Sequence, residues 1–370
     1  MNKHSIFFAA LLAAPLMVQP LSAAEARGFA HINGSNTVRP FADAVADRVG
    51  KSGKIKRPWV ESNSTSGGIQ LFCEPESGES PDIVNASRPM KKTEFEACEA
   101  SGVKDIVEVK IGYGGIVLAY SKKGPALDIT RKELFLALGK KVPDPKCKNC
   151  DTLVPNPYKT WKEINPSLPD TKIEVIAPPF GSGIRELFEE SVSKAGCESF
   201  PFIAAWKETQ KAKYKETCFT ARTDGAYVEE SGETVVGMLA KSPGVVGFVP
   251  YIQYANNTGR LNAARIDGVV PNAESIAANR YPITRPLFFY IKGSRVDKVK
   301  GLKQYISEFT SDKAWGEKGY LVSLGLLPMS AEERKLYAAD VKKLKSMPIP
   351  TDSMATSRVL PDARQSKAER

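Results

Sequence analysis

Four turns rich in serine, threonine and glycine carry the residue types that could bind a small anion. Hydroxyl groups and unpaired backbone N–H groups donate hydrogen bonds to oxyanion oxygens, and arginine adds a planar, two-pronged cation. A helix that begins at such a turn adds further free N–H groups and a partial positive charge. The four turns are GSNT (34–37), NSTSGG (63–68), ASR (86–88) and GSGIR (181–185). These residue types predict an oxyanion-binding site.

The stretch APPFGSGIRELFEE, residues 177–190, is the most informative of the four. It follows an apolar strand (IEVIA), turns at two prolines, and shows apolar residues at helical spacing from Ile184 onward. This pattern predicts a helix with Ser182 as its N-cap, with Gly183 beside it and Arg185 in the first turn. An ordinary capped helix start is the alternative for this turn taken alone.

Three earlier segments repeat the same design of apolar strand, polar turn and helix. They place at their turns Ser35, Asn36 and Thr37, then Thr65 and Ser66, then Ser87 and Arg88. Repeated units of this kind predict an α/β fold with mainly parallel sheets flanked by helices. Ligands of such sheets bind beyond the carboxyl ends of the strands, so the turns should converge.

Two long β-rich segments, VEVKIGYGGIVLAYSKKG and RYPITRPLFFYIKGS, lie about 170 residues apart. Two such crossings predict two lobes joined by a two-strand hinge, with one lobe discontinuous in sequence. The expected division is 1–26 as a signal peptide, 27–112 plus 285–350 as lobe I, 113–284 as lobe II and 351–370 as a polar, disordered tail.

The N-terminus has the pattern of a secretory signal. A basic MNKH precedes the apolar run IFFAALLAAPLMV, and LSAAEA offers small residues for cleavage after Ala24 or Ala26. No later segment approaches the roughly 18 apolar residues of a membrane span. We therefore expect a soluble periplasmic protein.

Six cysteines, an even number, suit an oxidising compartment, where disulfides are the default. Local pairing is the simplest of the 15 connectivities that six cysteines allow. A redox motif and half of a zinc site are the alternatives for CKNC, but its Pro-rich loop lacks a helix start to lower a thiol pKa and is poor in further ligands. The predicted pairs are Cys73–Cys98, Cys147–Cys150 and Cys197–Cys218.

Composition disfavours several classes of function. The chain has two histidines, and because His4 lies in the signal, a Ser-His-Asp hydrolase or a His-rich metal enzyme would depend on His31 alone. The formal charge of +10 is dispersed and lacks an aromatic-interleaved basic stripe, which argues against nucleic acid and suits the attraction of small anions. We predict neither a metal nor a cofactor.

Taken in order, ten segments resemble the periplasmic phosphate-binding proteins of ABC phosphate transporters, most of all the branch common in α-proteobacteria. The similarity covers nearly the whole chain after the signal. It implies a two-lobed, type 2 periplasmic binding protein: a monomer that closes on inorganic phosphate, passes it to permease subunits in the inner membrane and performs no catalysis. The segments are GSNTVRPF, ESNSTSGGIQLF, PDIVNASRPM, KIGYGGIVLAYS, DITRKELFLAL, PPFGSGIRELF, RTDGAYVE, GVVGFVPY, YPITRPLFFYIK and AWGEKGYLVSLGLLP.

The resemblance also implies a set of ligand-binding residues. Three departures from one well-known branch stand out: Arg88 replaces an Asp, Pro178 replaces an Arg, and Ile184 replaces a Thr. Arg88 and Arg185 then supply the positive charge. Arg222 and Asp224 are either further groups near the ligand or a local ion pair that holds a loop. The implied site comprises Ser35, Asn36, Thr37, Thr65, Ser66, Ser87, Arg88, Ser182, Gly183 and Arg185.

Discrimination between phosphate and sulfate needs a further group. Hydrogenphosphate carries a proton that sulfate lacks, so a carboxylate acceptor in the cleft would reject sulfate, by a factor of ~10⁴ or more. Asp82, Asp224 and Glu229 are the candidates, and the sequence does not choose among them.

Alternative functions stay open at this point. One is a binding protein for another tetrahedral oxyanion, such as sulfate or a phosphonate. Another is a phosphate sensor or adhesin without transport. A third is an exported phosphoesterase with Ser182 or Thr65 as nucleophile, against which the shortage of histidines and the absence of a GxSxG motif both count.

Overall fold

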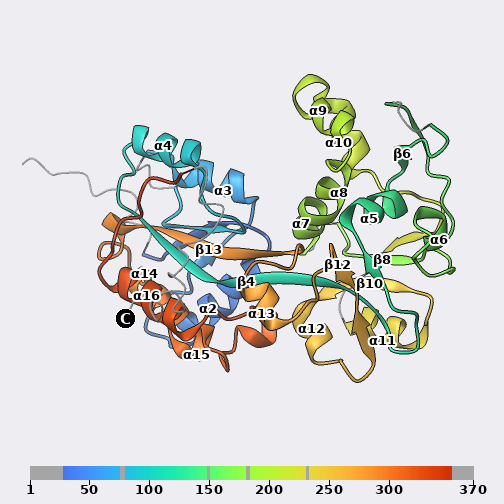
Figure 1. Cartoon of the computed structure of the whole chain (residues 1–370). Coiled ribbons are helices and arrows are strands. Elements are labelled where there is room, and N and C mark those ends of the chain that lie inside the picture. The colour runs from blue at the N-terminus through green and yellow to red at the C-terminus, as the bar shows by residue number, and fades with distance from the viewer. Residues whose placement is uncertain (1–27, 76–79, 148–150, 181–183, 231–232, 352–370) are drawn as a thin grey trace, which may run out of the picture.

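Two groups of helices and strands lie toward the two ends of the long strand β4 (Figure 1). Strand β4 (Ile106–Ser121) reaches from one group into the other, and β13 (Thr284–Lys292) runs antiparallel to its first part. These are the two crossings that the sequence predicted, so the two-lobed α/β architecture is confirmed; we call the groups lobe I and lobe II. The computed structural model describes residues 28–75, 80–147, 151–180, 184–230 and 233–351.

One continuous nine-stranded sheet passes through both lobes, in the order β2-β1-β3-β13-β4-β10-β8-β9 with β11 also paired to β4. In lobe I, β1 is parallel to β2 and β3, while β13 is antiparallel to β3. In lobe II, β10 is antiparallel to the far part of β4 and parallel to β8, which is parallel to β9. The other strands are β1 (His31–Gly34), β2 (Trp59–Val60), β3 (Ile83–Ala86), β8 (Val175–Ala177), β9 (Tyr227–Glu229), β10 (Val246–Pro250) and β11 (Leu261–Ala263), with β5 (Asp128–Ile129) pairing β12 (Arg265–Ile266) and β6 (Lys141–Pro143) pairing β7 (Leu153–Pro155).

The length of β4 explains how one sheet can extend through both lobes. Its 16 residues, at about 3.3 Å each, span about 50 Å. The first part pairs with β13 as far as Gly115, and residues 116–120 pair with β10. The sequence predicted a separate sheet for each lobe, whereas the sheets share this strand.

Helices cover both faces of the lobe I sheet. Side chains of a strand alternate between its faces: Phe289 packs in one cluster with α2 and α14, and the adjacent Phe288 packs in another with α3 and α4. Figure 1 shows α3 and α4 on one side of β13, with α2 and α14 on the other. The lobe I helices are α2 (Arg39–Lys51), α3 (Thr65–Phe72), α4 (Lys92–Ala100), α14 (Leu302–Phe309), α15 (Asp312–Trp315) and α16 (Ala331–Lys342), with 3₁₀ turns η2 (Gly293–Arg295) and η3 (Val322–Leu324).

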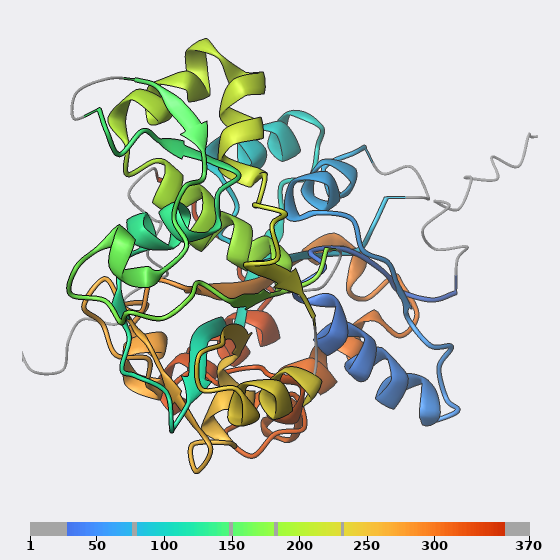
Figure 2. The same ribbon diagram turned by 90° about the vertical axis from the view of Figure 1, so that its right-hand side faces the viewer.

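Lobe II contains a continuous helical segment in which a π-helix, η1, lies between α7 and α8. In both views, α9 and α10 lie at the edge of the lobe, away from β4 and β13 (Figures 1 and 2). The lobe II helices are α5 (Arg131–Leu138), α6 (Trp161–Ile164), α7 (Arg185–Phe188), η1 (Glu189–Lys194), α8 (Ala195–Cys197), α9 (Pro201–Thr209), α10 (Lys211–Phe219), α11 (Glu233–Lys241), α12 (Tyr251–Ala255) and α13 (Ala273–Ala277).

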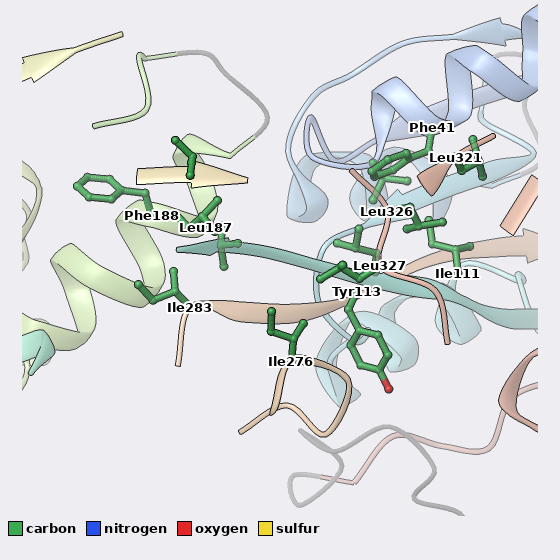
Figure 3. Close-up of a cluster of buried hydrophobic side chains, with 14 of the residues drawn as sticks. Phe41, Ile111, Tyr113, Leu187, Phe188, Ile276, Ile283, Leu321, Leu326 and Leu327 are labelled. Carbon is green, nitrogen blue, oxygen red and sulfur yellow. The ribbon is translucent and has the colours of Figure 1, made fainter. Parts of the chain in front are cut away.

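The hydrophobic core follows β4 from one lobe to the other. Figure 3 shows Phe41 and Leu326 near the lobe I part of this strand, and Leu187 and Phe188 of α7 near its far part. All four side chains are buried in one cluster. The junction between the lobes is therefore packed, and in this arrangement α7 lies beside the turns of lobe I.

Two of the predicted disulfides are present. Cys73–Cys98 joins the end of α3 to α4, and Cys197–Cys218 joins α8 to α10. Cys150 lies outside the described residues, so the pair Cys147–Cys150 stays a prediction. No helix within the described ranges combines the length and apolar character needed to cross a bilayer.

Candidate functional site

The first three polar turns of the chain meet at one end of the lobe I sheet. The Ser35 amide donates to the carbonyl of Asn85 (2.9 Å), and the Asn63 amide donates to the carbonyl of Gly34 (2.8 Å). Gly68 lies against Gly34 so closely that a Cβ at position 68 would come within 2.4 Å of the Gly34 Cα. Gly68, the second glycine of TSGG, is thus required for the second turn to approach the first.

Hydroxyl groups from these turns lie together below the surface. The Ser87 amide donates to Thr65 Oγ1 (3.1 Å), and the two side-chain oxygens are also 3.1 Å apart. Thr65, Ser87 and Thr37 are all buried, and Ser35 Oγ accepts from the Thr37 amide (3.2 Å). The second and third turns are therefore held together by the hydroxyls that the sequence assigned to the ligand.

A buried arginine on the crossing strand extends this group. Arg285 lies opposite Gly114 of β4, and its Nη2 donates to Thr37 Oγ1 (3.0 Å). The same nitrogen is 3.4 Å from Glu186 Oε2, while Nη1 donates to Glu190 Oε2 (2.9 Å). Burial lowers the pKa of Arg285, and the two carboxylates oppose that shift. An arginine remains charged in either case.

Glu186 connects this arginine to the hydroxyls. It belongs to α7 of lobe II, yet its Oε2 lies 3.5 Å from Ser87 Oγ of lobe I. One group of five side chains therefore draws on three turns of lobe I, the crossing strand and one helix of lobe II. We call it the cleft cluster; its members are Thr37, Thr65, Ser87, Glu186 and Arg285.

Arg88 is engaged within lobe I. Its guanidinium makes two hydrogen bonds to Glu94 (2.7 and 2.9 Å) and one to Ser66 Oγ (2.8 Å). Burial alone would lower the pKa of Arg88, but the hydrogen bonds and charge of Glu94 outweigh it and raise the pKa. Burial alone would raise the pKa of Glu94, but the hydrogen bonds and charge of Arg88 outweigh it and lower the pKa. The charge of Arg88 is thus already balanced locally.

Arg185 is engaged within lobe II. It donates to Glu189 (2.7 Å), to Glu229 (2.5 Å) and to the carbonyl of Pro178 (3.0 Å). Although burial opposes it, hydrogen bonding to Glu189 is chief among the interactions that raise the pKa of Arg185. These contacts fasten the turn after β8 to α7.

The predicted N-cap of this helix is wrong. The helix begins at Arg185 with Ile184 as N-cap, because the Ile184 carbonyl accepts the first helical hydrogen bond, from the Phe188 amide (3.0 Å). Ser182 and Gly183 lie outside the described residues, so their ligand-binding roles stay predictions. Asn36 is exposed at the first turn.

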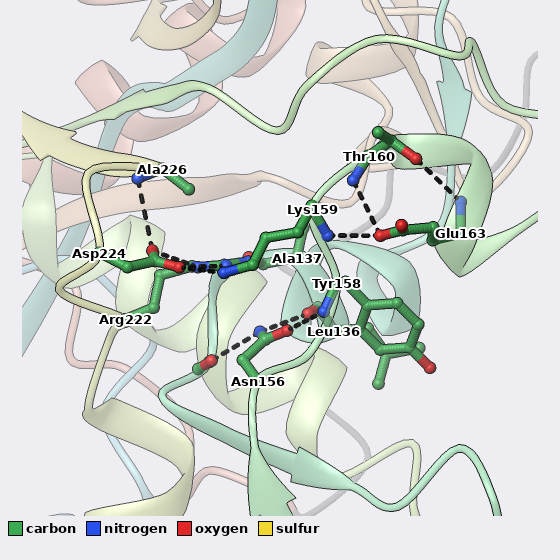
Figure 4. A network of polar contacts seen from close by, with 11 residues as sticks. Leu136, Ala137, Asn156, Tyr158, Lys159, Thr160, Glu163, Arg222, Asp224 and Ala226 are labelled. Carbon is green, nitrogen blue, oxygen red and sulfur yellow. Dashed lines mark hydrogen bonds and ion pairs between the residues drawn. The ribbon is translucent and has the colours of Figure 1, made fainter.

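Arg222 and Asp224 form a local ion pair, one of the two alternatives that the sequence left open. Two hydrogen bonds join them (2.8 and 2.6 Å), and Arg222 also donates to the carbonyl of Ala137 (3.1 Å) (Figure 4). Lys159 adds a contact to Asp224 (3.0 Å). Hydrogen bonding from Arg222 holds the pKa of Asp224 well below its usual range.

The carboxylates suggested as proton acceptors lie elsewhere. Asp82 precedes β3 while Ser87 follows it, so the two lie at opposite ends of that strand; Asp82 is buried and accepts from the His31 amide (2.8 Å) and from Arg295 (3.0 Å). Glu229 binds Arg185, and Asp224 binds Arg222. None of the three is within the cleft cluster.

Sequence reasoning missed Arg285, Glu186 and Glu190. The signal for Arg285 was a charged residue inside the apolar run YPITRPLFFYIK, since an arginine is rarely buried unless paired. The signal for the glutamates was their spacing of four residues, which places both on one face of a helix. Neither signal says what the side chains would meet.

Comparison with known proteins assigns the family. A family model described as a PBP superfamily domain matches residues 21–313.

The chain belongs to the PBP superfamily.

Curated relatives align with most of this PBP superfamily chain at low sequence identity. Protein SphX of Synechococcus elongatus is 26% identical over 335 residues, covering 88% of this chain and 85% of the relative. The phosphate-binding protein PstS of Staphylococcus epidermidis is 26% identical over 304 residues, covering 80% and 79%. A crystal structure of a "possible phosphate binding protein" from Planctomyces limnophilus superposes with a TM-score of 0.65 at 21% identity, covering 86% of this chain and 99% of the other. The type 2 periplasmic binding protein fold inferred from the sequence is confirmed.

Proposed function

We propose that this protein binds inorganic phosphate between its two lobes and delivers it to an ABC-type importer of the inner membrane. Relatives that align with most of this chain are named phosphate-binding proteins, and their names support phosphate as the ligand. The observation that carries the proposal is the cleft cluster, in which three turns, a buried arginine and the opposite lobe come together. Donors from separate loops are what a small, multiply charged oxyanion requires.

The energetics favour this assignment of residues. Micromolar affinity corresponds to about −8 kcal/mol, and each charge-assisted hydrogen bond contributes roughly 1.5–3 kcal/mol. The hydroxyls of Thr37, Thr65 and Ser87 with the fork of Arg285 supply about that sum. The remaining predicted ligands, namely Ser35, Asn36, Ser66, Arg88, Ser182, Gly183 and Arg185, belong to the same proposal as groups that complete the shell when the lobes close.

The cellular location, the oligomeric state and the partners of the protein are part of the proposal. We infer export to the periplasm by residues 1–26, action as a monomer, and no role for nucleic acid, cofactor or metal. The division into 27–112 plus 285–350 and 113–284 is proposed as the two moving bodies. We also propose that no bond is made or broken, since the chain after the signal holds one histidine and its relatives are named binding proteins.

Calorimetry of the mature protein, stripped of ligand by partial unfolding, tests the proposal. We expect phosphate to bind at micromolar concentration or below, and a chromogenic phosphomonoester to remain intact. Binding of sulfate or a phosphonate in place of phosphate would reassign the ligand within the oxyanions. If no oxyanion binds, or if the ester is hydrolysed and a Ser182→Ala control is inactive, the proposal is wrong.

A further inference from the structure

A groove lined by basic side chains lies between α2 and α14 of lobe I. Its volume is about 590 Å³, a size typical of small-molecule sites. Helix α2 begins two residues after Thr37 of the cleft cluster, and its 13 residues span about 20 Å. The groove lies at the other end of this helix, where it is lined by Arg48, Val49 and Ser52. It is therefore separate from the place where the lobes meet.

Four cations and one carboxylate are found among the described residues that line this groove. Arg48 comes from α2 and Lys54 from the loop that follows it, while Lys300 and Lys303 lie at the start of α14. All four basic side chains are exposed. Glu308, further along α14, is the acidic member. The two walls of the groove thus both carry positive charge.

A close contact between the two walls holds two of these lysines near each other. Gly301 has a φ of 88° at the N-cap of α14, and a Cβ at this position would come within 3.0 Å of Ile55 Cγ2. Lys300 and Lys54 are the residues immediately before this pair. Like charges repel, and this repulsion weakens the folded state. An anion between the two lysines would remove it.

The nearby acidic and aromatic groups leave most of this charge available. Glu308 accepts from the Tyr320 hydroxyl (3.1 Å), and the Arg48 guanidinium lies 3.9 Å from the centroid of the same ring. Lys303 contacts Asp297 at 3.2 Å, but the two side chains are 72% and 74% exposed, and such surface pairs contribute little. A multiply charged anion can therefore compete for these cations.

Hydrogen-bond donors predominate along the groove, so its ligand should consist mainly of acceptors. Lysine and arginine side chains only donate, and the groups of Ser52, Gln304 and Ser307 can donate as well. The α14 side runs from Lys300 to Glu308, roughly 12 Å at the rise of a helix. A chain of phosphoryl groups presents acceptor oxygens and negative charge on every unit. An acidic peptide would add backbone N–H donors, which also need acceptors.

We propose that the groove between α2 and α14 is a second anion site, which binds an oligophosphate chain of three or more phosphoryl groups. Lys54 and Lys300 contact the chain from the two walls, and Arg48 and Lys303 extend the charged surface along it. Binding is reversible, and no bond of the chain is made or broken. This site goes beyond the binding of phosphate in the cleft and does not depend on which ligand the cleft takes.

The test is calorimetric titration of tripolyphosphate into the mature protein saturated with orthophosphate, in the absence of divalent cations. Orthophosphate occupies the cleft, so the remaining heat reports the groove. We expect tripolyphosphate to bind, with an affinity that falls as the salt concentration rises. The double variant Lys54→Gln, Lys300→Gln should lose about tenfold to hundredfold in this affinity and keep the orthophosphate affinity of the wild type. Arg285→Ala, which disables the cleft, should bind tripolyphosphate as the wild type does.

The double variant Lys211→Gln, Lys215→Gln is the matched control. It removes the same two charges from exposed positions on α10 of lobe II. We expect its affinity for tripolyphosphate to equal that of the wild type. Melting curves establish that each variant is folded, and tripolyphosphate should raise the melting temperature of the wild type and the control more than that of the groove variant.

ATP, a longer polyphosphate and hexa-aspartate complete the set of probes. Tighter binding of ATP would identify a nucleotide as the source of the chain, and tighter binding of the longer polymer would identify inorganic polyphosphate; either result supports the oligophosphate assignment. Tighter binding of hexa-aspartate than of tripolyphosphate would overturn it in favour of an acidic peptide.

Two further results would overturn the proposal. One is a failure of tripolyphosphate to bind the protein saturated with orthophosphate. The other is an equal loss of affinity in the two double variants, since net charge would then explain the binding. Neither result would affect the proposed function, which fails only if orthophosphate itself does not bind.

Discussion

The two lobes contribute opposite chemistry to the place where they meet. Lobe I brings hydroxyl groups at the ends of parallel strands, held by one another and by backbone amides. Lobe II brings one carboxylate from α7 and one from the π-helix that follows it, and the crossing strand supplies the arginine that contacts both. Neither side alone resembles a complete anion site, because the lobe I hydroxyls of the cleft cluster carry no charge and the lobe II side is acidic.

This difference teaches that charge neutralisation and anion recognition are separate tasks here. Arg88 and Arg185, the arginines beside the predicted turns, are each balanced within their own lobe. Arg285 alone of the three contacts side chains of both lobes. Variants that change one side at a time should therefore have unequal effects on phosphate affinity.

Replacing Arg285 should have the largest effect. Arg285→Ala removes the fork between Thr37 and the two glutamates, and it leaves two carboxylates without their cation. With charge-assisted bonds of roughly 1.5–3 kcal/mol each, we expect phosphate affinity measured by calorimetry to fall by about hundredfold or more. Arg285→Lys keeps the charge but not the fork, and should recover only part of the loss. An affinity within about threefold of the wild type would remove Arg285 from the site.

Removing hydroxyls from lobe I should have an intermediate effect. Thr65→Val and Ser87→Ala each delete one donor, and we expect phosphate affinity to fall by about tenfold for either. Since Thr65 Oγ1 and Ser87 Oγ also contact each other at 3.1 Å, the double variant should lose less than the product of the two factors. Full additivity in the double-mutant cycle would mean that the two hydroxyls act independently.

Replacing Arg88 should have the smallest effect on phosphate. Arg88→Met leaves the cleft cluster intact, so we expect phosphate affinity to fall by less than about threefold. It also leaves the partly buried Glu94 without its ion-pair partner, which should lower the free energy of unfolding by about 1–3 kcal/mol. An affinity loss comparable to that of Arg285→Ala would show that Arg88 is a principal ligand and not a minor member of the shell.

The same variant carries a pH signature. Because Arg88 holds the pKa of Glu94 below its ordinary value of 4.5, the pair stabilises the fold above that value, and its contribution is lost as pH falls through the folded-state pKa. Denaturation curves of wild type and Arg88→Met should therefore converge in acid. A stability gap that persists unchanged there would contradict the ion-pair account.

Local sequence patterns were sufficient for the parts of the site that strand ends position. A turn of Ser, Thr and Gly after an apolar strand indicates where Thr65 and Ser87 lie, because parallel strands bring their carboxyl ends to one edge. Pairing of cysteines near in sequence was also predictable, as Cys73–Cys98 and Cys197–Cys218 show.

Contacts that depend on how the lobes stand relative to each other were not predictable. Glu186 meets Ser87 across 99 positions of sequence, and Arg285 meets Thr37 across 248. No periodicity within a segment encodes such a distance. Asp82 and Arg88 show the same limit. Each was predicted to act at the ligand because of its neighbours in sequence. Its actual partners depend on which end of the strand it occupies and which way its side chain faces.

The π-helix between α7 and α8 has a consequence for how this chain tolerates change. A π turn contains one more residue than an α turn, and an α-helix advances about 100° per residue. Deleting one residue within Glu189–Lys194 would therefore convert the π turn into an α turn and leave α7 and the disulfide-anchored α8 in their present orientations. Deleting Leu187 or Phe188 in α7 would instead rotate Glu186 by about 100° around the helix axis and move it off the interface.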